Sequence, residues 1–418
     1  MKINFHTSDL SSIANKFAIC MGINMKRKIC IVTGTRAEYG LLKPLIKRVI
    51  SDSELELFLY VTGAHLSPEF GLTYREIEGD NIPIKRKIEM LLSADTSSSV
   101  VKAMGIEMIG FADALAEDRP DIMVVLGDRY EILAAAIAAM ICKIPIAHIH
   151  GGELTEGLID EASRHSITKM SYLHFTTTDT YRKRIIQLGE QPDRVFNVGS
   201  LGIESIKTLT LLTRRELEEQ IKFSFAGKIA MVTYHPVTLE SEDEVRQQFE
   251  NLLDVLRQFS QLKIIFTKAN ADMGGRIING AIDDFVAENK GRCAAYESLG
   301  QLRYLSALQF CSIVIGNSSS GIIEAPSFHI PTVNIGDRQR GRVYAASVIN
   351  CENTFRDINR AVSFGLSEEA LNKMANVANP YERPDTSENI IKIIKAYFKK
   401  GIDIKKVFYD MQVNLSEG

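Results

Sequence analysis

The sequence is poor in the features that mark membrane, fibrous and disordered proteins. Its 418 residues include no tryptophan, only 11 prolines and 28 glycines, too few for a collagenous or low-complexity chain. The longest apolar run without a charge extends from Ile132 to Cys142. A membrane helix needs about 18–20 such residues, so we expect no membrane span. Because 45% of the residues are hydrophobic and 24% are charged, the composition is that of a globular protein.

A large excess of charge of either sign is also missing. The chain has 49 Lys and Arg against 52 Asp and Glu, a net charge of −3, and no basic block. Binding to nucleic acid or to an anionic membrane depends on clustered positive charge. We therefore expect neither as a partner.

The six cysteines include no CxxC pair and no metal-type spacing. Four of them lie in or beside apolar runs, where cysteine acts as a small core residue. A reducing cytoplasm is then the simplest compartment. Residues 1–24 lack the apolar stretch and cleavage site of a secretory signal, and we interpret them as an N-terminal extension.

From Lys28 onward, strand-like and helix-like segments alternate. Helix-period segments such as Leu41–Ile50, Val100–Leu115 and Ile132–Cys142 separate short runs rich in β-branched residues. This alternation predicts parallel sheets that are covered by helices on both faces. The expected strands are Ile29–Thr33, Leu57–Val61, Ile122–Leu126, Ile144–Ile149, Tyr172–Thr176, Val195–Val198, Ile229–Thr233, Lys263–Phe266, Cys293–Ala295, Ile313–Ile315 and Thr332–Ile335.

The pattern predicts two doubly wound, Rossmann-like α/β domains, residues 25–207 and 208–384, with the ligand in a cleft between them. The polar segment Ile206–Glu219 is expected to connect them. A final amphipathic helix, Ser387–Phe398, begins the tail 385–418, which we expect to pack back on the N-terminal domain.

Polar residues follow several predicted strands of the first domain. Thr33-Gly34-Thr35-Arg36 is neither a Walker loop nor a dinucleotide fingerprint, and reads as a phosphate contact or an ordinary turn. Asp128 and Arg129, followed by Glu131, combine a base with a cation, although Asp128 could instead cap the next helix.

The next strand ends in a group of histidines and acids. His148 and His150 fall on one face of the strand, before Gly151, Gly152 and Glu153. A zinc site, structural histidines and metal-free acid/base contacts are the three interpretations. Asp160 and Arg164, four residues apart, share one face of the following helix and would pair even in a purely structural helix.

The second domain supplies groups of the kind that bind phosphate. His235 and Asn270 follow two of its strands. Gly316-Asn317-Ser318-Ser319-Ser320-Gly321 places small hydroxyl residues at a helix start, which favours an anion site over simple capping. Arg338 and Arg342 follow the last predicted strand and could complete a site for a diphosphate.

Seven of these motifs, in order over about residues 25–400, resemble the hydrolysing UDP-N-acetylglucosamine 2-epimerases, and most closely their bacterial sialic-acid branch. The motifs are Thr33–Tyr39, Gly127–Arg129, His148–Glu153, Asp160–His165, His235–Thr238, Gly316–Gly321 and Asp337–Gln339.

The resemblance implies a glycosyltransferase-B-like fold and a set of site residues. It implies carboxylate chemistry at Asp128 and Asp160, with Arg129 nearby. Many relatives have Glu at the position of His150, so His150, Glu153 or Glu131 could be the second acid or base. The residues expected to contact UDP or the sugar are Arg36, Lys43, His65, His148, His235, Asn270, Ser318, Ser319, Gly321, Glu324, Arg338 and Arg342.

The implied reaction converts UDP-N-acetylglucosamine to N-acetylmannosamine and UDP, through elimination to a 2-acetamidoglucal and then hydration, for sialic-acid-type biosynthesis. The alternatives are the same chemistry on UDP-2,4-diacetamido-2,4,6-trideoxyglucose, and a non-hydrolysing epimerase. A glycosyltransferase of the same fold and a UDP-sugar-binding protein without activity are further alternatives. We expect no metal or nicotinamide cofactor, and a homodimer or homotetramer.

Overall fold

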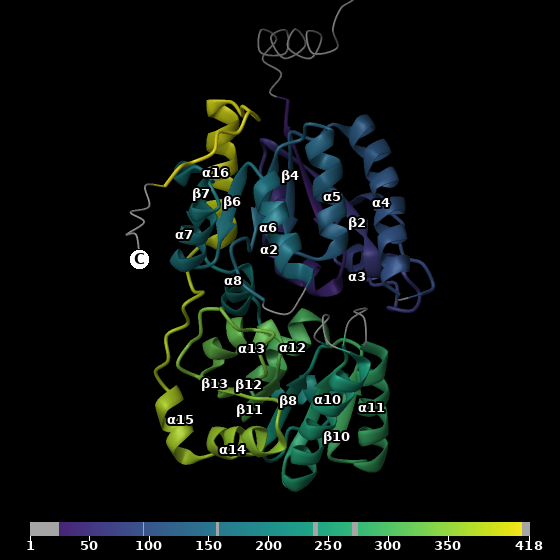
Figure 1. The fold of residues 1–418 in the computed structure, drawn as a ribbon, viewed down its shortest axis with the longest axis vertical. Coiled ribbons are helices and arrows are strands. Elements are labelled where there is room, and N and C mark those ends of the chain that lie inside the picture. The colour runs from purple at the N-terminus through teal and green to yellow at the C-terminus, as the bar shows by residue number, and fades with distance from the viewer. Residues whose placement is uncertain (1–24, 95, 156–158, 237–240, 270–274, 412–418) are drawn as a thin grey trace, which may run out of the picture.

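The structure is a computed structural model that describes residues 25–94, 96–155, 159–236, 241–269 and 275–411. The chain forms two α/β domains, each built on one parallel sheet with helices on both faces (Figure 1). The predicted doubly wound architecture is therefore confirmed. Residues 1–24, the expected extension, lie outside the described residues.

The N-terminal sheet has seven strands in the order β3-β2-β1-β4-β5-β6-β7. Every residue of β4 is buried, because helices cover both faces of the sheet. The strands are β1 Arg27–Thr33, β2 Leu55–Thr62, β3 Ile84–Ile88, β4 Ile122–Leu126, β5 Ile146–Ile149, β6 Leu173–Thr176 and β7 Val195–Asn197. The helices are α2 Arg36–Ser51, α3 Tyr74–Gly79, α4 Ser97–Asp118, α5 Tyr130–Ile141, α6 Ile159–Met170, α7 Asp179–Gln187 and α8 Leu201–Thr208, with 3₁₀ turns η1 Gly63–Leu66 and η2 Pro192–Arg194.

The C-terminal sheet has six strands in the order β10-β9-β8-β11-β12-β13. They are β8 Ile229–Thr233, β9 Lys263–Thr267, β10 Cys293–Tyr296, β11 Ile313–Gly316, β12 Thr332–Ile335 and β13 Val348–Cys351. The helices are α9 Arg214–Ile221, α10 Glu242–Gln258, α11 Gly275–Glu288, α12 Gly300–Leu308, α13 Ser319–Ile323, α14 Phe355–Gly365 and α15 Glu368–Met374, with the 3₁₀ turn η3 Ala325–Phe328.

The segment expected to connect the domains, Ile206–Glu219, contains the end of one helix and the start of another. Helix α8 ends at Thr208, and α9 begins only at Arg214. The break has a local cause, because Thr213 and Glu216 form a capping box that starts a new helix.

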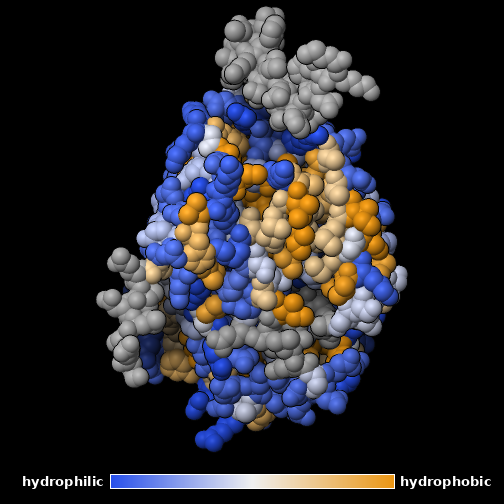
Figure 2. All heavy atoms as spheres, turned by 45° about the horizontal axis from the view of Figure 1, so that its top comes forward, coloured by the Kyte–Doolittle hydropathy of each residue, from blue (hydrophilic) through white to orange (hydrophobic). Residues whose placement is uncertain are grey.

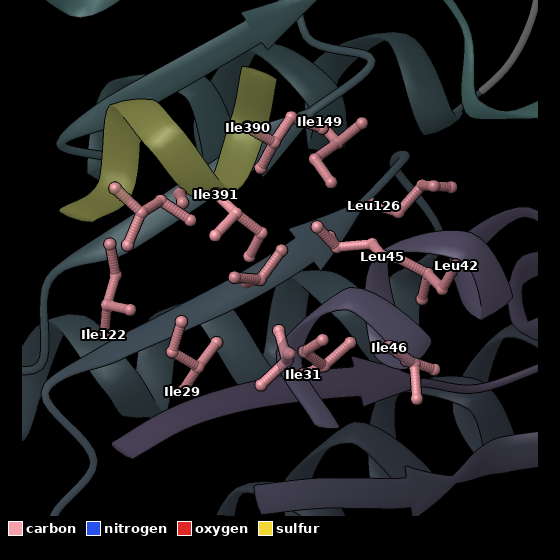
Figure 3. Packing of buried hydrophobic residues seen from close by; sticks show 14 of the residues in the cluster. Ile29, Ile31, Leu42, Leu45, Ile46, Ile122, Leu126, Ile149, Ile390 and Ile391 are labelled. Carbon is pink, nitrogen blue, oxygen red and sulfur yellow. The ribbon is translucent and has the colours of Figure 1, made fainter. Parts of the chain in front are cut away.

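The last helix, α16 (Thr386–Lys400), returns to the N-terminal domain. Figure 3 shows Ile390 and Ile391 of this helix among side chains from β1, β4 and α2. Its N-terminal turn is fixed by Glu204 of α8, which accepts hydrogen bonds from Ser387 N at 2.8 Å and Ser387 Oγ at 2.7 Å. The core of the first domain is thus built from both ends of the chain.

Candidate active site

Asp128 and His150 lie next to each other at the carboxyl ends of two paired strands. Strands β4 and β5 run parallel with Leu126 opposite Ile149, and Gly127 N donates to Ile149 O at 3.0 Å. Arg129, not Asp128, occupies the N-cap position of α5. The Asp128 carboxylate instead accepts a hydrogen bond from Arg164 Nη2, so helix capping does not explain this aspartate.

Arg164 of α6 connects four oxygen atoms around this strand end. It is 1% exposed, and besides Asp128 it donates to Glu153 O at 2.9 Å, Thr155 Oγ1 at 2.8 Å and Glu161 Oε2 at 2.8 Å. Burial alone would raise the pKa of Asp128, but the positive charges of Arg164 and Arg342 lower it further than burial raises it. Asp128 is therefore held as a carboxylate.

His150 and Glu153 form a second pair beside Asp128. His150 Nδ1 lies 3.4 Å from Glu153 Oε1, which also accepts from Thr177 Oγ1 at 3.2 Å. Burial lowers the pKa of His150 despite the opposing effect of Glu153, so the imidazole is neutral near pH 7. Its Nε2 is buried and has no hydrogen-bond partner in the described part of the chain. A neutral imidazole can give or accept a proton there.

The C-terminal domain reaches this pair through Arg342. Its Nη1 lies 2.6 Å from Glu153 Oε2, and both side chains are buried. Next to it, Val343 N donates to Tyr181 OH at 2.9 Å, and Tyr381 OH donates to Val343 O at 2.8 Å. An ion pair and a small polar network thus join the two domains at the predicted site.

Glu131 turns away from this group and into the N-terminal domain. Its Oε1 accepts from Arg129 Nε at 2.7 Å, and its side chain lies under Gly34, where a Cβ would be 2.6 Å from Glu131 Cγ. Two further buried acids are close. Burial and then the charge of Glu131 raise the pKa of Glu38 to about 8 and that of Glu107 to about 9.

Three of the predicted binding residues make their contacts inside the N-terminal domain. His148 bonds through Nε2 to Gly127 O at 2.7 Å and through Nδ1 to Thr168 Oγ1 at 3.2 Å. His65 bonds to Thr33 Oγ1 at 3.1 Å and Thr73 Oγ1 at 2.8 Å. Burial lowers the pKa of His148 to about 3 and of His65 to about 4, so both are neutral. Lys43 pairs with Asp80 at 2.6 Å.

Arg36 and Glu324 lie where the two domains approach each other. Arg36 pairs with Glu76 at 2.5 Å, and its Nη2 would be 2.6 Å from a Cβ on Gly300 of the C-terminal domain. Glu324 Oε1 would be 2.7 Å from a Cβ on Gly202 of α8. Burial raises the pKa of Glu324 to about 7.

Asn317 organises the predicted phosphate-binding groups of the C-terminal domain. Its Oδ1 accepts from His235 N at 2.7 Å, and its Nδ2 donates to His235 O at 2.8 Å. Its carbonyl oxygen accepts from Arg338 Nη1 at 3.0 Å. Ser318 caps α13, which contains Ser319 and Gly321. The structure therefore brings His235, Arg338 and the serine loop together.

Two predicted site residues, Asn270 and Asp160, do not belong to the groups described above. Asn270 lies outside the described residues, as do Val237 and Thr238 of the motif His235–Thr238. Asp160 occupies the first turn of α6 and is partly buried. Among the residues that the structure describes, no group of three or more His, Cys, Asp and Glu side chains could hold a metal ion.

Comparison with known proteins shows the family to which the chain belongs. Residues 47–395 match the family model described as UDP-N-acetylglucosamine 2-epimerase. The chain belongs to this family. The GDP/UDP-N,N'-diacetylbacillosamine 2-epimerase (hydrolyzing) of Campylobacter jejuni is 44% identical over 327 residues, which cover 78% of this chain and 85% of that protein. The polysialic acid biosynthesis protein P7 of Escherichia coli is 40% identical over 387 residues, covering 92% and 98%.

A solved structure of the epimerase family has the same fold. The UDP-GlcNAc 2-epimerase of Neisseria meningitidis bound to UDP-GlcNAc matches with a TM-score of 0.74, covering 88% of this chain and 100% of that one. At 18% identity this likeness concerns the fold alone. Together with the relatives, it places the chain among the hydrolysing 2-epimerases of UDP-sugars with a glycosyltransferase-B-like fold.

Sequence reasoning missed the central place of Arg164 and Asn317 in this epimerase. The spacing predicts Arg164 on one helix face with Asp160, and the structure adds hydrogen bonds from Arg164 to Asp128, Glu153, Thr155 and Glu161. Both residues lie within the motifs that carry the family resemblance, and this position was the one sign in the sequence of their importance. Tyr181 and Tyr381, 200 residues apart and 2.8 Å between hydroxyls, gave no signal because only folding brings them together.

Proposed function

We propose that the chain releases UDP from a UDP-activated 2-acetamido sugar and yields the free 2-epimer. The hydrogen on C2 of such a sugar becomes acidic only as the C1–O bond to UDP stretches and positive charge grows on the ring. A base then takes the C2 proton, the C1–O electron pair leaves with UDP, and a 2-acetamidoglucal forms. Water next adds its hydroxyl to C1, and a proton enters C2 from the opposite face.

The observation that carries this proposal is the grouping of Asp128, His150 and Glu153 beside Arg342 of the other domain. We assign proton transfer to the Asp128 carboxylate and to the His150–Glu153 pair. Glu131 is less suited, because it is turned under Gly34 and paired with Arg129. Asp160, in the first turn of α6, remains a candidate in the same chemistry.

The leaving group needs positive charge and hydrogen-bond donors that act as the C1–O bond breaks. We propose that Arg342, Arg338, His235 and the serine loop supply them from the C-terminal domain, with Arg36 reaching from the first domain. Charge-assisted hydrogen bonds contribute about 1.5–3 kcal/mol each, so a few suffice to hold a diphosphate.

Two sugars are candidates for the substrate. The 44% identity with the Campylobacter jejuni enzyme favours UDP-N,N'-diacetylbacillosamine, the diacetamido trideoxy sugar. The 40% identity with the polysialic acid biosynthesis protein over 98% of its length favours a role in sialic-acid-type biosynthesis, for which UDP-N-acetylglucosamine is the substrate that the motifs imply. We propose the diacetamido sugar as the first candidate and UDP-N-acetylglucosamine as the second.

Turnover in deuterated water tests the reaction and the sugar together. We expect free UDP and a free 2-epimer with deuterium at C2, faster with the preferred sugar. A UDP-linked epimer as the product would show a non-hydrolysing enzyme instead. Asp128→Asn should reduce turnover by at least about 100-fold while UDP still binds, because positioned acid/base groups contribute about 10²–10⁴-fold. Asp254→Asn, on an exposed part of α10, is the matched control.

We also propose that the reaction needs no nicotinamide, because elimination and hydration together transfer no hydride. We propose that it needs no metal either, because Arg342, Arg338 and the other donors supply the positive charge for the leaving diphosphate. Turnover should therefore survive a chelator. A cytoplasmic location and a homo-oligomeric state are part of the same proposal. Within the described residues, no helix is both long and apolar enough to cross a membrane.

A further inference from the structure

Two buried tyrosines that the proposed reaction does not use lie where the domains meet. Tyr181 comes from α7 of the N-terminal domain, and Tyr381 comes from the segment between α15 and α16. Both are 0% exposed, so neither contributes to the surface that Figure 2 shows. They pack with Ile203 of α8 and with Ile322 and Ile323 of α13, and Figure 1 shows these two helices on opposite sides of the domain junction.

The two hydroxyl groups and one peptide unit form a closed ring of hydrogen bonds. Tyr381 OH donates to Val343 O at 2.8 Å, and this bond uses its only proton. The bond of 2.8 Å between the two hydroxyls is therefore donated by Tyr181, whose oxygen accepts in turn from Val343 N at 2.9 Å. Hydrogen bonds linked in this way strengthen one another. The ring thus fixes the Val343 peptide of the C-terminal domain against a helix of the N-terminal domain.

The same helix fixes Glu153, the partner of Arg342. Thr177, two residues before α7, donates through Oγ1 to Glu153 Oε1 at 3.2 Å. Gly152 packs against the backbone of α7, where a Cβ would be 2.6 Å from Tyr181 O. The beginning of α7 therefore holds the loop that carries Glu153 and, through the tyrosine hydroxyl, the peptide next to Arg342.

Arg342 keeps a hydrogen-bond donor for a ligand. Its Nη1 faces Glu153 Oε2 at 2.6 Å, and its side chain is 7% exposed. Its Nε is buried and makes no hydrogen bond to any residue that the structure describes. A buried donor without a partner costs free energy, which an oxygen atom of a bound ligand would recover.

We propose that Tyr181 and Tyr381 are positioning residues that hold Arg342, through the Val343 peptide, where its guanidinium stabilises the leaving diphosphate. They act through Arg342 and touch no reacting atom. The inference rests on the proposed function, in which Arg342 supplies positive charge as the C1–O bond breaks. Tyrosines with a purely structural role would stabilise the fold and leave the reaction unchanged.

Phenylalanine variants test the ring, because phenylalanine keeps the packed aromatic side chain and removes only the hydroxyl. Tyr181→Phe and Tyr381→Phe should each lower kcat by roughly 10-fold to 100-fold, since a displacement of about 1 Å can cost about 100-fold in rate. The double variant should be little slower than either single variant, because one missing hydroxyl already opens the ring.

Tyr60→Phe is the matched control. Tyr60 is 0% exposed, belongs to a different buried cluster, and donates through its hydroxyl to Asp118 Oδ2 at 2.7 Å. This variant loses a comparable hydrogen bond, so it should lose stability in urea unfolding but keep the turnover of the wild type. Turnover at the wild-type rate in Tyr181→Phe and Tyr381→Phe as well would overturn the proposal.

The Arg342→Ala background separates positioning from a structural role. There, Tyr181→Phe and Tyr381→Phe should have almost no further effect, because the group that they position is gone. Losses of the same size in both backgrounds would contradict the proposal.

The same comparison is made in the Kd for UDP, by isothermal titration. In the presence of Arg342, each tyrosine variant should raise this Kd roughly tenfold, a change within the contribution of one charge-assisted hydrogen bond. Failure of the proposed function is a different result, in which the wild type releases UDP from no UDP-sugar. The Kd values would still decide whether the tyrosines position Arg342, since they require no turnover.

Discussion

The guanidinium of Arg164 is buried among oxygen atoms of Asp128, Glu153, Thr155 and Glu161. Removal of this charge leaves burial as the main influence on Asp128, which raises the pKa of a carboxyl. The group would then hold its proton to higher pH. Arg164 thus acts on the reaction through the ionisation and the position of Asp128.

Arg164→Gln should lower kcat by about 100-fold and move the acidic limb of the kcat/KM profile to higher pH. Glutamine removes the positive charge that lowers the pKa of Asp128. The measurement is the pH dependence of UDP release, with Arg257→Gln on the exposed side of α10 as control. A lower rate with an unmoved acidic limb would show that Arg164 only stabilises the fold.

At the scale of elements, α2, α4 and α5 bring together three buried acids. Glu38, Glu107 and Glu131 each come from a different one of these helices. Burial raises the pKa of Glu107 to about 9 from its ordinary 4.5, so the folded protein keeps a proton that the unfolded chain loses. Between these two values the free energy of unfolding must fall as the pH rises. Below about pH 4.5 both states are protonated and this effect ends.

Glu107→Gln should flatten this dependence. Glutamine can keep the hydrogen bond that Thr62 Oγ1 donates at 2.8 Å, without a titrating proton. Each group of this kind changes the free energy of unfolding by up to about 1.4 kcal/mol per pH unit. Urea unfolding between pH 5 and pH 8 measures the difference. Glu117→Gln, exposed on the same helix, is the control, and equal slopes for Glu107→Gln and the wild type would contradict the prediction.

The elements also show how far the sequence predicts the structure. Strands β4, β8 and β12 have the expected limits, because continuous apolar runs between helices are buried on both faces. The edge strand β3 escaped prediction, because its sequence Ile-Lys-Arg-Lys-Ile has three consecutive charged residues and no apolar run. The short edge strand β13, Val348–Cys351, was missed as well.

The sequence predicts the position of those site residues that directly follow a strand. Asp128 and His150 follow two neighbouring parallel strands, so their proximity could be expected from the alternation alone. The partners of Arg164 and the burial of Glu131 under Gly34 could not be predicted from the sequence. They depend on the paths of loops, which the strand pattern does not determine.

At the scale of the whole molecule, an ion pair from Arg342 to Glu153 joins the two domains. The neighbouring Gly341 has a φ of +82°, and a Cβ there would be 2.5 Å from Leu154 Cδ1. A larger residue would force the segment with Arg342 away from Glu153. The geometry of the domain junction therefore depends on this glycine.

Gly341→Ala should raise the Kd for UDP about tenfold and lower turnover, because it displaces Arg342. Gly227→Ala is a matched control, since Gly227 has a φ of +91° and no atom within 4 Å of the added Cβ. The control should cost only the backbone strain, about 1 kcal/mol of stability. Isothermal titration with UDP and urea unfolding separate the two effects. Equal UDP affinity in both variants would show that the contact with Leu154 does not position the site.

The return of α16 to the first domain has a consequence for biosynthesis. The ribosome releases residues 25–207 long before Ile390, Ile391 and Ile394, which belong to the same buried cluster as β1 and β4. Until α16 has been synthesised, the side of the first sheet that it covers stays open to water or to a chaperone. The C-terminal domain can close its core earlier, because its apolar cluster ends at Val362. We therefore expect the second domain to complete its folding before the first domain, which must wait for the synthesis of α16.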